Sequence, residues 1–183
     1  YDPYWEYRKP ITIDNTQVPE SQTNFPVLMN FTDSNLRDYS QADGGDIVFT
    51  SGNGRVQLDH EVVRYDSSDG TLVAWVKVPQ LYSLTDTTLY MYYGHGVVSN
   101  QENPTGVWNS DYKGVYHFNE NVDDSTTNYD GTDSGSSDVA GQIDRARDFL
   151  APDRINFASG AWISGYIDEK TMQAWINPDA TSG

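Results

Sequence analysis

Apolar side chains recur at every second position through several short segments of this chain, and no other feature constrains its fold as strongly. In residues 71–78, one parity is filled by Leu72, Ala74, Val76 and Val78. The first segment repeats the pattern with Trp5, Tyr7, Ile11 and Ile13. A period of two is that of a β-strand with one buried face. Both segments are therefore predicted to be half-buried strands.

Seven further segments have the composition of short strands. They are residues 25–31, 46–50, 56–65, 88–93, 114–118, 154–157 and 171–177. Turn-forming clusters such as Gly44-Gly45 and Gly94-His95-Gly96 separate them. The 13 Tyr, 6 Phe and 5 Trp also favour strands over helices. The sequence therefore predicts an all-β fold, as an antiparallel sandwich or a jelly roll.

Two segments carry weak helical signals. Residues 34–39 are predicted to form a single turn with Ser34 as its N-cap. Ile143, Ala146 and Phe149 recur at a spacing of three, which suits a helix. Ile143 and Phe149 also suit the ends of strands on either side of a polar connection, so both interpretations stay open.

The composition changes near residues 94–107, which indicates a boundary. Residues 90–93 are densely aromatic, whereas residues 99–106 are polar and contain one proline. Such a composition is typical of a linker. We therefore expect a first module over residues 1–98, a linker over 99–106 and a second module over 107–183.

An ordered set of blocks in the first module resembles the domain of unknown function 2341. The blocks are Trp5 to Ile13, Phe25-Pro26-Val27-Leu28, Gly45 to Thr50, His60-Glu61, Trp75 to Pro79 and Tyr90 to Gly94. The resemblance covers residues 4 to about 98. It implies a β-sandwich module of secreted or surface proteins of bacteria and archaea, commonly followed by a concanavalin A-like, laminin-G-type domain.

The second module resembles the beginning of such a concanavalin A-like domain. The blocks that carry this resemblance are Val107 to Phe118, Asp124 to Asn128, Gly141 to Ala146 with Phe149, and Gln173 to Ile176. Asp144 departs from the pattern, which usually has glycine there. The resemblance implies a partial jelly-roll sandwich, because such a domain needs more residues than follow residue 107. Either the sequence is incomplete, or other chain segments complete the sandwich by strand exchange or subunit packing.

The net charge of the chain restricts its partners. Asp and Glu number 27 against 11 Lys and Arg, which gives a formal charge of −16. This charge opposes a phosphate backbone and an anionic membrane surface, so we expect neither nucleic acid as a partner nor direct membrane insertion. No apolar run is long enough to span a bilayer, and any signal peptide or anchor is expected to lie outside the numbered residues. The absence of cysteine excludes disulfides and thiol chemistry.

Known catalytic motifs are missing from the sequence. His60, His95 and His117 are the three histidines, and their spacing fits no zinc site. His60 shares its parity with apolar neighbours, and His117 lies in a strand-like block, so structural roles are favoured for both. No nucleophile elbow is present, and no strand alternates acids as glycoside hydrolysis in such folds requires. We therefore expect no enzymatic activity.

The most suggestive chemical segment is 119–138, which is rich in acids and contains no Lys or Arg. Oxygen ligands at this density suit calcium, which takes six to eight oxygens. The candidate ligands are Asp123, Asp124, Asn128 and Asp130. The alternative is a solvated acidic loop, which the sequence favours somewhat.

Exposed aromatic rings are a second candidate for binding, because sugar rings stack on Trp and Tyr. The candidates are Trp108, Tyr112, Trp162 and Tyr166. Large strand aromatics are more often core residues, so that alternative stays open. Asn30-Phe31-Thr32 is a glycosylation sequon.

Taken together, these features favour a non-catalytic structural or adhesive module of an extracellular or cell-surface protein. Its expected partners are further copies of the chain or other surface-protein chains. The alternative is a carbohydrate-binding accessory module that delivers a larger secreted protein to a polysaccharide. An enzyme fragment is the third and least favoured interpretation.

Overall fold

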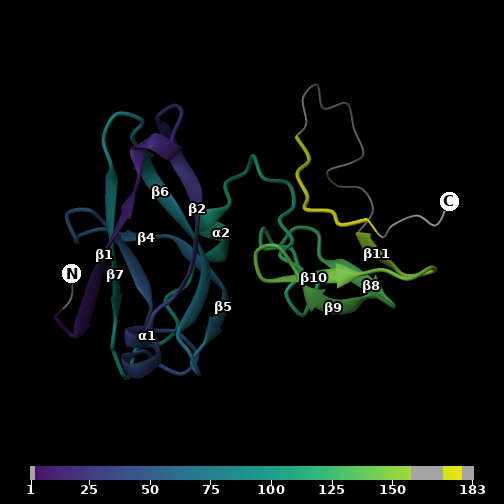
Figure 1. Cartoon of the computed structure of the whole chain (residues 1–183), viewed down its shortest axis with the longest axis horizontal. Helices are drawn as coiled ribbons and strands as arrows, with labels where there is room; N and C mark the ends of the chain where they lie inside the picture. The colour runs from purple at the N-terminus through teal and green to yellow at the C-terminus, as the bar shows by residue number, and fades with distance from the viewer. Residues whose placement is uncertain (1–2, 158–170, 179–183) are drawn as a thin grey trace.

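Strands dominate the computed structural model, which describes residues 3–157 and 171–178 (Figure 1). The helices within those ranges are short: η1 (Asn15–Gln17), α1 (Ser34–Tyr39) and α2 (Pro104–Val107). The predicted all-β fold with antiparallel sheets is confirmed. No helix among these residues is long and apolar enough to cross a membrane.

Two antiparallel sheets pack face to face in the first part of the chain. The first sheet has the order β1 (Tyr7–Ile13), β7 (Thr87–Tyr93), β3 (Val48–Ser51) and β4 (Gln57–Leu58). The second has the order β2 (Gln22–Thr32), β6 (Thr71–Leu81) and β5 (His60–Asp66). Among the strands of residues 3–157, β5 is thus an edge strand that pairs with β6 on one side only.

The core between the sheets follows the alternation of the sequence. All four residues of the parity predicted for 71–78 are buried in it, with exposed fractions of 1% or less. Phe49, Leu89 and Met91 of the first sheet pack against them. The other parity of β6 lies on the outer face of the second sheet, where Val73 is buried and Trp75 is partly buried. Something beyond the two sheets must therefore pack on that outer face.

The predicted helical turn at Ser34–Tyr39 is confirmed, but its predicted cap is wrong. Asp33, not Ser34, is the N-cap: its carboxylate accepts a hydrogen bond from the Asn35 amide at 3.0 Å. Asp33 keeps an extended backbone, with φ −138°, while Ser34 is already helical. The Asp33 carboxylate also forms an ion pair with Lys9 of β1, a contact that the local sequence does not reveal.

Two small antiparallel sheets of two strands each follow in the second part of the chain. β9 (Ser137–Ala140) pairs with β10 (Arg145–Asp148), and β8 (Gly131–Ser134) pairs with β11 (Arg154–Phe157). The strand predicted at 154–157 is confirmed. Because β10 occupies residues 145–148, the strand interpretation of Ile143, Ala146 and Phe149 holds and the helical one is wrong. The polar strands β8 and β9 had no signal in the apolar pattern.

Two predicted strands are wrong. Residues 114–118 are irregular, because the Val115 amide donates to the Asp124 carboxylate at 2.9 Å and Phe118 has a positive φ of 55°, which ends an extended backbone. Residues 171–177 also form no strand. Their large side chains are exposed, Met172 by 79% and Trp175 by 72%, so alternation there is not matched by packing within the described residues.

The segment expected as a linker, 99–106, is bonded to the sandwich. The Gln101 amide donates to the Gly45 carbonyl at 3.2 Å, and the Asn103 amide donates to the His60 carbonyl at 2.9 Å. α2 follows directly, and its Val107 is only 1% exposed. This stretch therefore guides the chain onto β5 and β6 (Figure 1).

Candidate functional site

Glu61 is the centre of the densest polar cluster at the contact between the sandwich and the following segment. It lies on β5, with its side chain on the outer face of the second sheet, and is 8% exposed. Its Oε2 accepts from Trp108 Nε1 at 2.7 Å and lies 3.1 Å from His117 Nε2, and its Oε1 accepts from Ser125 Oγ at 2.6 Å. One carboxylate therefore joins β5 to three positions spread over residues 108–125.

The environment of Glu61 favours its charged form. Burial by itself would raise the pKa of a carboxyl group, but the hydrogen bond and charge of His117 lower it, and the Ser125 and Trp108 donors lower it further, so the net pKa lies below its ordinary value. A carboxylate accepts only, so the facing nitrogen of His117 carries a hydrogen. The cluster is thus a buried anion with its hydrogen bonds satisfied.

An aromatic cluster surrounds this carboxylate and covers the outer face of β6. Trp75 lies edge-on to Trp108, with ring centroids 5.4 Å apart, and its ring stacks near His117 at 6.3 Å and 21°. Tyr112 meets Trp108 at 5.1 Å. These rings exclude water from the Glu61 bonds, which strengthens them.

The predicted sugar-stacking residues lie in different settings. Trp108 is 7% exposed and its ring is enclosed by Trp75, His117 and Tyr112, so it packs as a core residue. Tyr112 is 37% exposed at the margin of the same cluster. Trp162 and Tyr166 lie outside the described residues. Among the candidates that the structure describes, only Tyr112 presents a substantial surface.

The acidic loop is organised by Asp124, which is 2% exposed. Its Oδ1 accepts from the Val115 and Thr126 amides, and its Oδ2 from the Thr126 hydroxyl and the Tyr129 amide, at 2.6 to 3.1 Å. Burial would raise the pKa of Asp124, but these hydrogen bonds, first that of the Thr126 hydroxyl, lower it below its ordinary value. Both oxygens are thus engaged by the protein itself.

The other predicted calcium ligands do not converge with Asp124 on a common point. Asp130 accepts from the Asp124 amide at 3.0 Å, and the Asn128 amide group donates to Thr126 at 3.0 Å. Asp123 is exposed, and its amide donates to Asn121. In the described ranges, no three His, Asp or Glu side chains are grouped closely enough to hold a metal ion. The geometry here is that of a loop held by its own hydrogen bonds.

The two other histidines occupy packed positions. His60 is fully buried in the core, with Nδ1 3.2 Å from the Leu58 carbonyl oxygen and its ring edge-on to Phe49. Burial lowers its pKa below the ordinary value. His95 packs against Trp5, with ring centroids 4.6 Å apart.

The Glu61 cluster has residue types found in catalytic sites, but in another order. A serine triad needs a serine hydroxyl that donates to an imidazole, which in turn is oriented by an acid. Here Ser125 and His117 both bond to Glu61. The carboxylate therefore ties two donors together and does not relay a proton from one to the other.

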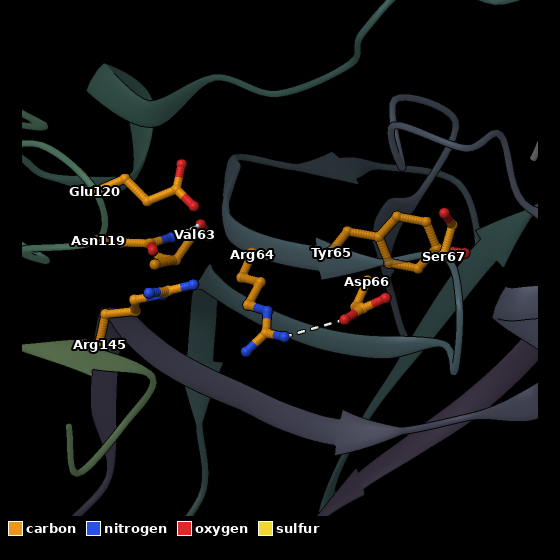
Figure 2. A pocket seen from close by; sticks show the side chains of 8 residues that line it. All are labelled: Val63, Arg64, Tyr65, Asp66, Ser67, Asn119, Glu120 and Arg145. Atoms are coloured by element: carbon orange, nitrogen blue, oxygen red, sulfur yellow. Dashed lines mark hydrogen bonds and ion pairs between the residues drawn. The ribbon is translucent and has the colours of Figure 1, made fainter. Parts of the chain in front are cut away.

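A cavity of about 380 Å³ opens beside β5, where the sandwich meets the loop after Phe118 (Figure 2). One wall is formed by residues 63–67, and the other by Asn119, Glu120 and Arg145. Figure 2 shows these last three side chains gathered on one side, opposite Asp66, with Arg64 between them. The lining is thus almost entirely polar, and it comes from both parts of the chain.

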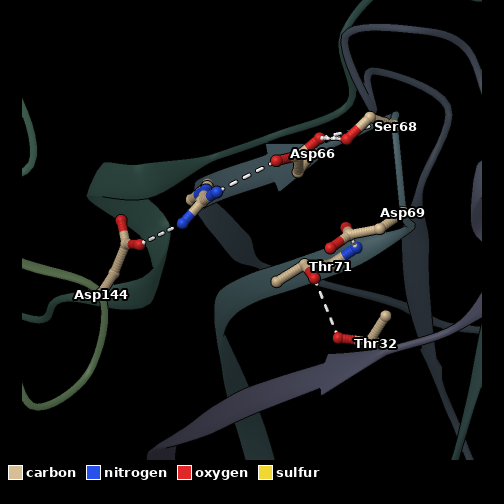
Figure 3. A network of polar contacts seen from close by, with 7 residues as sticks. Thr32, Asp66, Ser68, Asp69, Thr71 and Asp144 are labelled. Carbon is tan, nitrogen blue, oxygen red and sulfur yellow. Dashed lines mark hydrogen bonds and ion pairs between the residues drawn. The ribbon is translucent and has the colours of Figure 1, made fainter. Parts of the chain in front are cut away.

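Polar contacts hold the two walls together. Asn119 Nδ2 donates to the Val63 carbonyl oxygen at 2.5 Å, and Asn30 Nδ2 donates to the Ile143 carbonyl oxygen at 3.3 Å. The Arg64 guanidinium pairs with Asp66 at 3.0 Å and with Asp144 at 2.9 Å, two contacts that converge in Figure 3. Asp144, where the resembled pattern has glycine, therefore supplies an ion pair between β5 and the turn before β10.

Sequence reasoning did not find these contact residues. His60-Glu61 stood out as a block, but its partners are 47 or more residues away along the chain. Only the unusual Asp144 was a local signal. Asn119 was indicated only as part of the segment 119–138, and Arg145 of β10 had no signal, because single polar residues are common in loops and on exposed strands.

Residues 43–133 match the family model of a domain of unknown function, DUF2341. This range begins later than the blocks compared above and continues past residue 98, so it includes Glu61 together with Trp108, His117 and Ser125. The resemblance to a concanavalin A-like domain has no counterpart among the matches. No curated protein and no solved structure matches the chain significantly.

Proposed function

We propose that the chain is a non-catalytic structural or adhesive module of an extracellular or cell-surface protein, where it forms or joins a surface assembly. The observation that supports this most is the use of Glu61. This buried carboxylate accepts from Trp108, His117 and Ser125, which fasten the sandwich to the following segment. Such an arrangement suits a rigid building unit.

The rest of the chain fits the same role. Residues 107–183 are proposed to begin a concanavalin A-like, laminin-G-type module, which the antiparallel strand pairs β9–β10 and β8–β11 would suit. The open edges of these strand pairs suit pairing with further copies or other surface-protein chains. The charge of −16 disfavours nucleic acid and membrane as alternatives.

Immunogold imaging of the native cells tests this function. An antibody raised against the chain should label the outside of the cell, in a repeating pattern if the chain joins an assembly. Label confined to the cell interior would contradict the proposal. Turnover of a polysaccharide by the purified chain, abolished by Glu61→Gln, would contradict its non-catalytic part.

A carbohydrate-binding accessory module is the second candidate, and the polar cavity beside β5 favours it. Sugar sites combine a concave surface with convergent hydrogen-bonding groups. A glycan array with calcium present separates the two candidates. A defined sugar ligand favours targeting of a larger protein, whereas a repeating surface polymer without sugar binding favours assembly.

A further inference from the structure

The cavity beside β5 has the size of a small-ligand site and is built by two distant stretches of chain. Its volume of about 380 Å³ lies within the range of about 300 to 1,000 Å³ typical of such sites. β5 supplies one wall, and the loop at Asn119 and Glu120, with Arg145 of β10, supplies the other. The Asn119 to Val63 and Arg64 to Asp144 contacts fix the separation of the walls.

Two opposite charges in this lining are not neutralised within the part of the chain that is described. Arg64 is paired with both Asp66 and Asp144. By contrast, Arg145 and Glu120 are exposed, and their side chains form no ion pair or hydrogen bond with the described residues. The cavity thus offers one free guanidinium with several N–H donors and one free carboxylate with two acceptor oxygens.

The backbone that presents Glu120 is strained. Phe118 and Glu120 both have positive φ, 55° and 63°, a region that is unfavourable for a residue with a side chain. Between them, Asn119 is held by its bond to the Val63 carbonyl. The surrounding contacts therefore keep the Glu120 side chain at the cavity at a cost in backbone energy.

We propose that this cavity binds a neutral sugar unit of a glycan, an inference that rests on the second candidate function, a carbohydrate-binding accessory module. A sugar hydroxyl both donates and accepts, so neighbouring hydroxyls use the Arg145 donors and the Glu120 acceptors together. A polyanion would be repelled by Glu120 and by the net charge of −16, and a cation would be repelled by Arg145. A neutral polyhydroxylated ligand satisfies both groups without an unpaired charge.

The test is a titration of the whole chain, followed by amide chemical shifts in two-dimensional NMR. The probes are cellobiose, maltose and N,N′-diacetylchitobiose, with glucuronic acid as the anionic comparison. At least one neutral probe should shift the amides of residues 63–67 and 119–120 in a saturable manner. Arg145→Ala and Glu120→Ala should each weaken that binding about tenfold, the loss expected for a partly exposed charged hydrogen bond.

Matched controls are Arg55→Ala and Glu20→Ala, exposed residues of the same types outside the cavity, which should leave the affinity unchanged. The inference is overturned if no neutral probe shifts the cavity amides, if both cavity variants bind as well as the wild type, or if glucuronic acid binds more tightly. Cleavage of a bound probe would instead overturn the non-catalytic function while leaving the site in place. Labelling of the cell surface without any sugar binding would support the structural role and contradict the proposed sugar site.

Discussion

Glu61 is the residue on which the contact between β5 and residues 108–125 depends most. Replacing it with alanine leaves the Trp108 indole N–H, the Ser125 hydroxyl and His117 without their shared acceptor in a dry environment. We expect Glu61→Ala to lower the free energy of unfolding by about 3 kcal/mol. Glu61→Gln keeps one acceptor oxygen and should lower the free energy of unfolding by less, about 1 kcal/mol.

Urea unfolding followed by tryptophan fluorescence measures this loss, because Trp75 and Trp108 flank the carboxylate. Glu20→Ala, an exposed acid of the sandwich, is the matched control and should lie within about 0.5 kcal/mol of the wild type. Equal stability of Glu61→Ala and the control would show that the contact does not depend on this carboxylate.

The N-cap of α1 gives a second prediction for single residues, because Asp33 and Ser34 have different roles there. Asp33→Ala removes the acceptor for the Asn35 amide and the partner of Lys9, so the free energy of unfolding should fall by about 1 to 2 kcal/mol. Ser34→Ala replaces a residue that is already helical and should change it by less than about 0.5 kcal/mol. Thermal unfolding of both variants checks this order, and a larger effect at Ser34 would contradict it.

At the scale of elements, the strands were predictable where one face is buried and the other is not. The alternation in β1 and β6 follows from packing against the opposite sheet, so composition and period were sufficient there. Residues 114–118 have strand composition, but the Val115 amide donates its hydrogen bond to the Asp124 carboxylate and not to a neighbouring strand. The competing partner comes from nine residues further on, which a local pattern does not include.

The polar strands β8 and β9 could not be predicted from the sequence in this way. β8 and β9 consist of small and acidic residues, and their side chains are mostly exposed, so no apolar period marks them. Likewise, Asn119 and Arg145 enter the candidate site only because the chain folds back on β5. The sequence indicated that the loop at 119–138 is rich in acids. It could not indicate that three backbone amides and the Thr126 hydroxyl donate hydrogen bonds to the Asp124 carboxylate.

The edge of β5 gives a prediction at this scale. Glu102 accepts from the Val62 amide at 2.8 Å, and Asn103 and Asn119 bond to the His60 and Val63 carbonyls. These contacts cover the unpaired side of an edge strand, and residues 107–126 cover its outer face. A fragment of residues 1–98 should therefore be less stable than one of residues 1–133, and it should bind a hydrophobic dye through the uncovered Val73 and Trp75.

Guanidinium unfolding and dye fluorescence of the two fragments check this expectation. The longer fragment ends where the DUF2341 match ends. If the two fragments unfold at the same denaturant concentration and neither binds dye, residues 99–133 do not contribute to the stability of the sandwich.

For the whole molecule, the shifted pKa values predict loss of stability on acidification. The pKa of buried His60 lies below its ordinary 6.5, so the unfolded chain takes up a proton first and stability falls as the pH drops through about 6.5. The pKa of Glu61 lies below the ordinary 4.5 of a glutamate, and the pKa values of Asp124 and Asp33 lie below the ordinary 3.8 of an aspartate. Their contributions are present above those ordinary values and are lost as the pH falls further, through the folded-state pKa values.

Melting temperatures between pH 8 and pH 2.5 should therefore decline in two stages. His60→Gln should weaken the first stage, and Glu61→Gln the second. The same change in melting temperature between pH 8 and pH 5 in the wild type and in His60→Gln would contradict the assignment of a neutral, buried His60.

The pairing of β1 with β7 also determines how tension would pass through the molecule. Tyr7 at the start of β1 lies opposite Tyr93 at the end of β7, so the chain enters and leaves the first sheet at the same end of one antiparallel ladder. Pulling there would peel the ladder apart one bond at a time, with little mechanical resistance. The contacts of residues 101–125 with the sandwich divert a downstream pull into β5, so the Glu61 cluster acts as a clamp that bears force before the peeling ladder does.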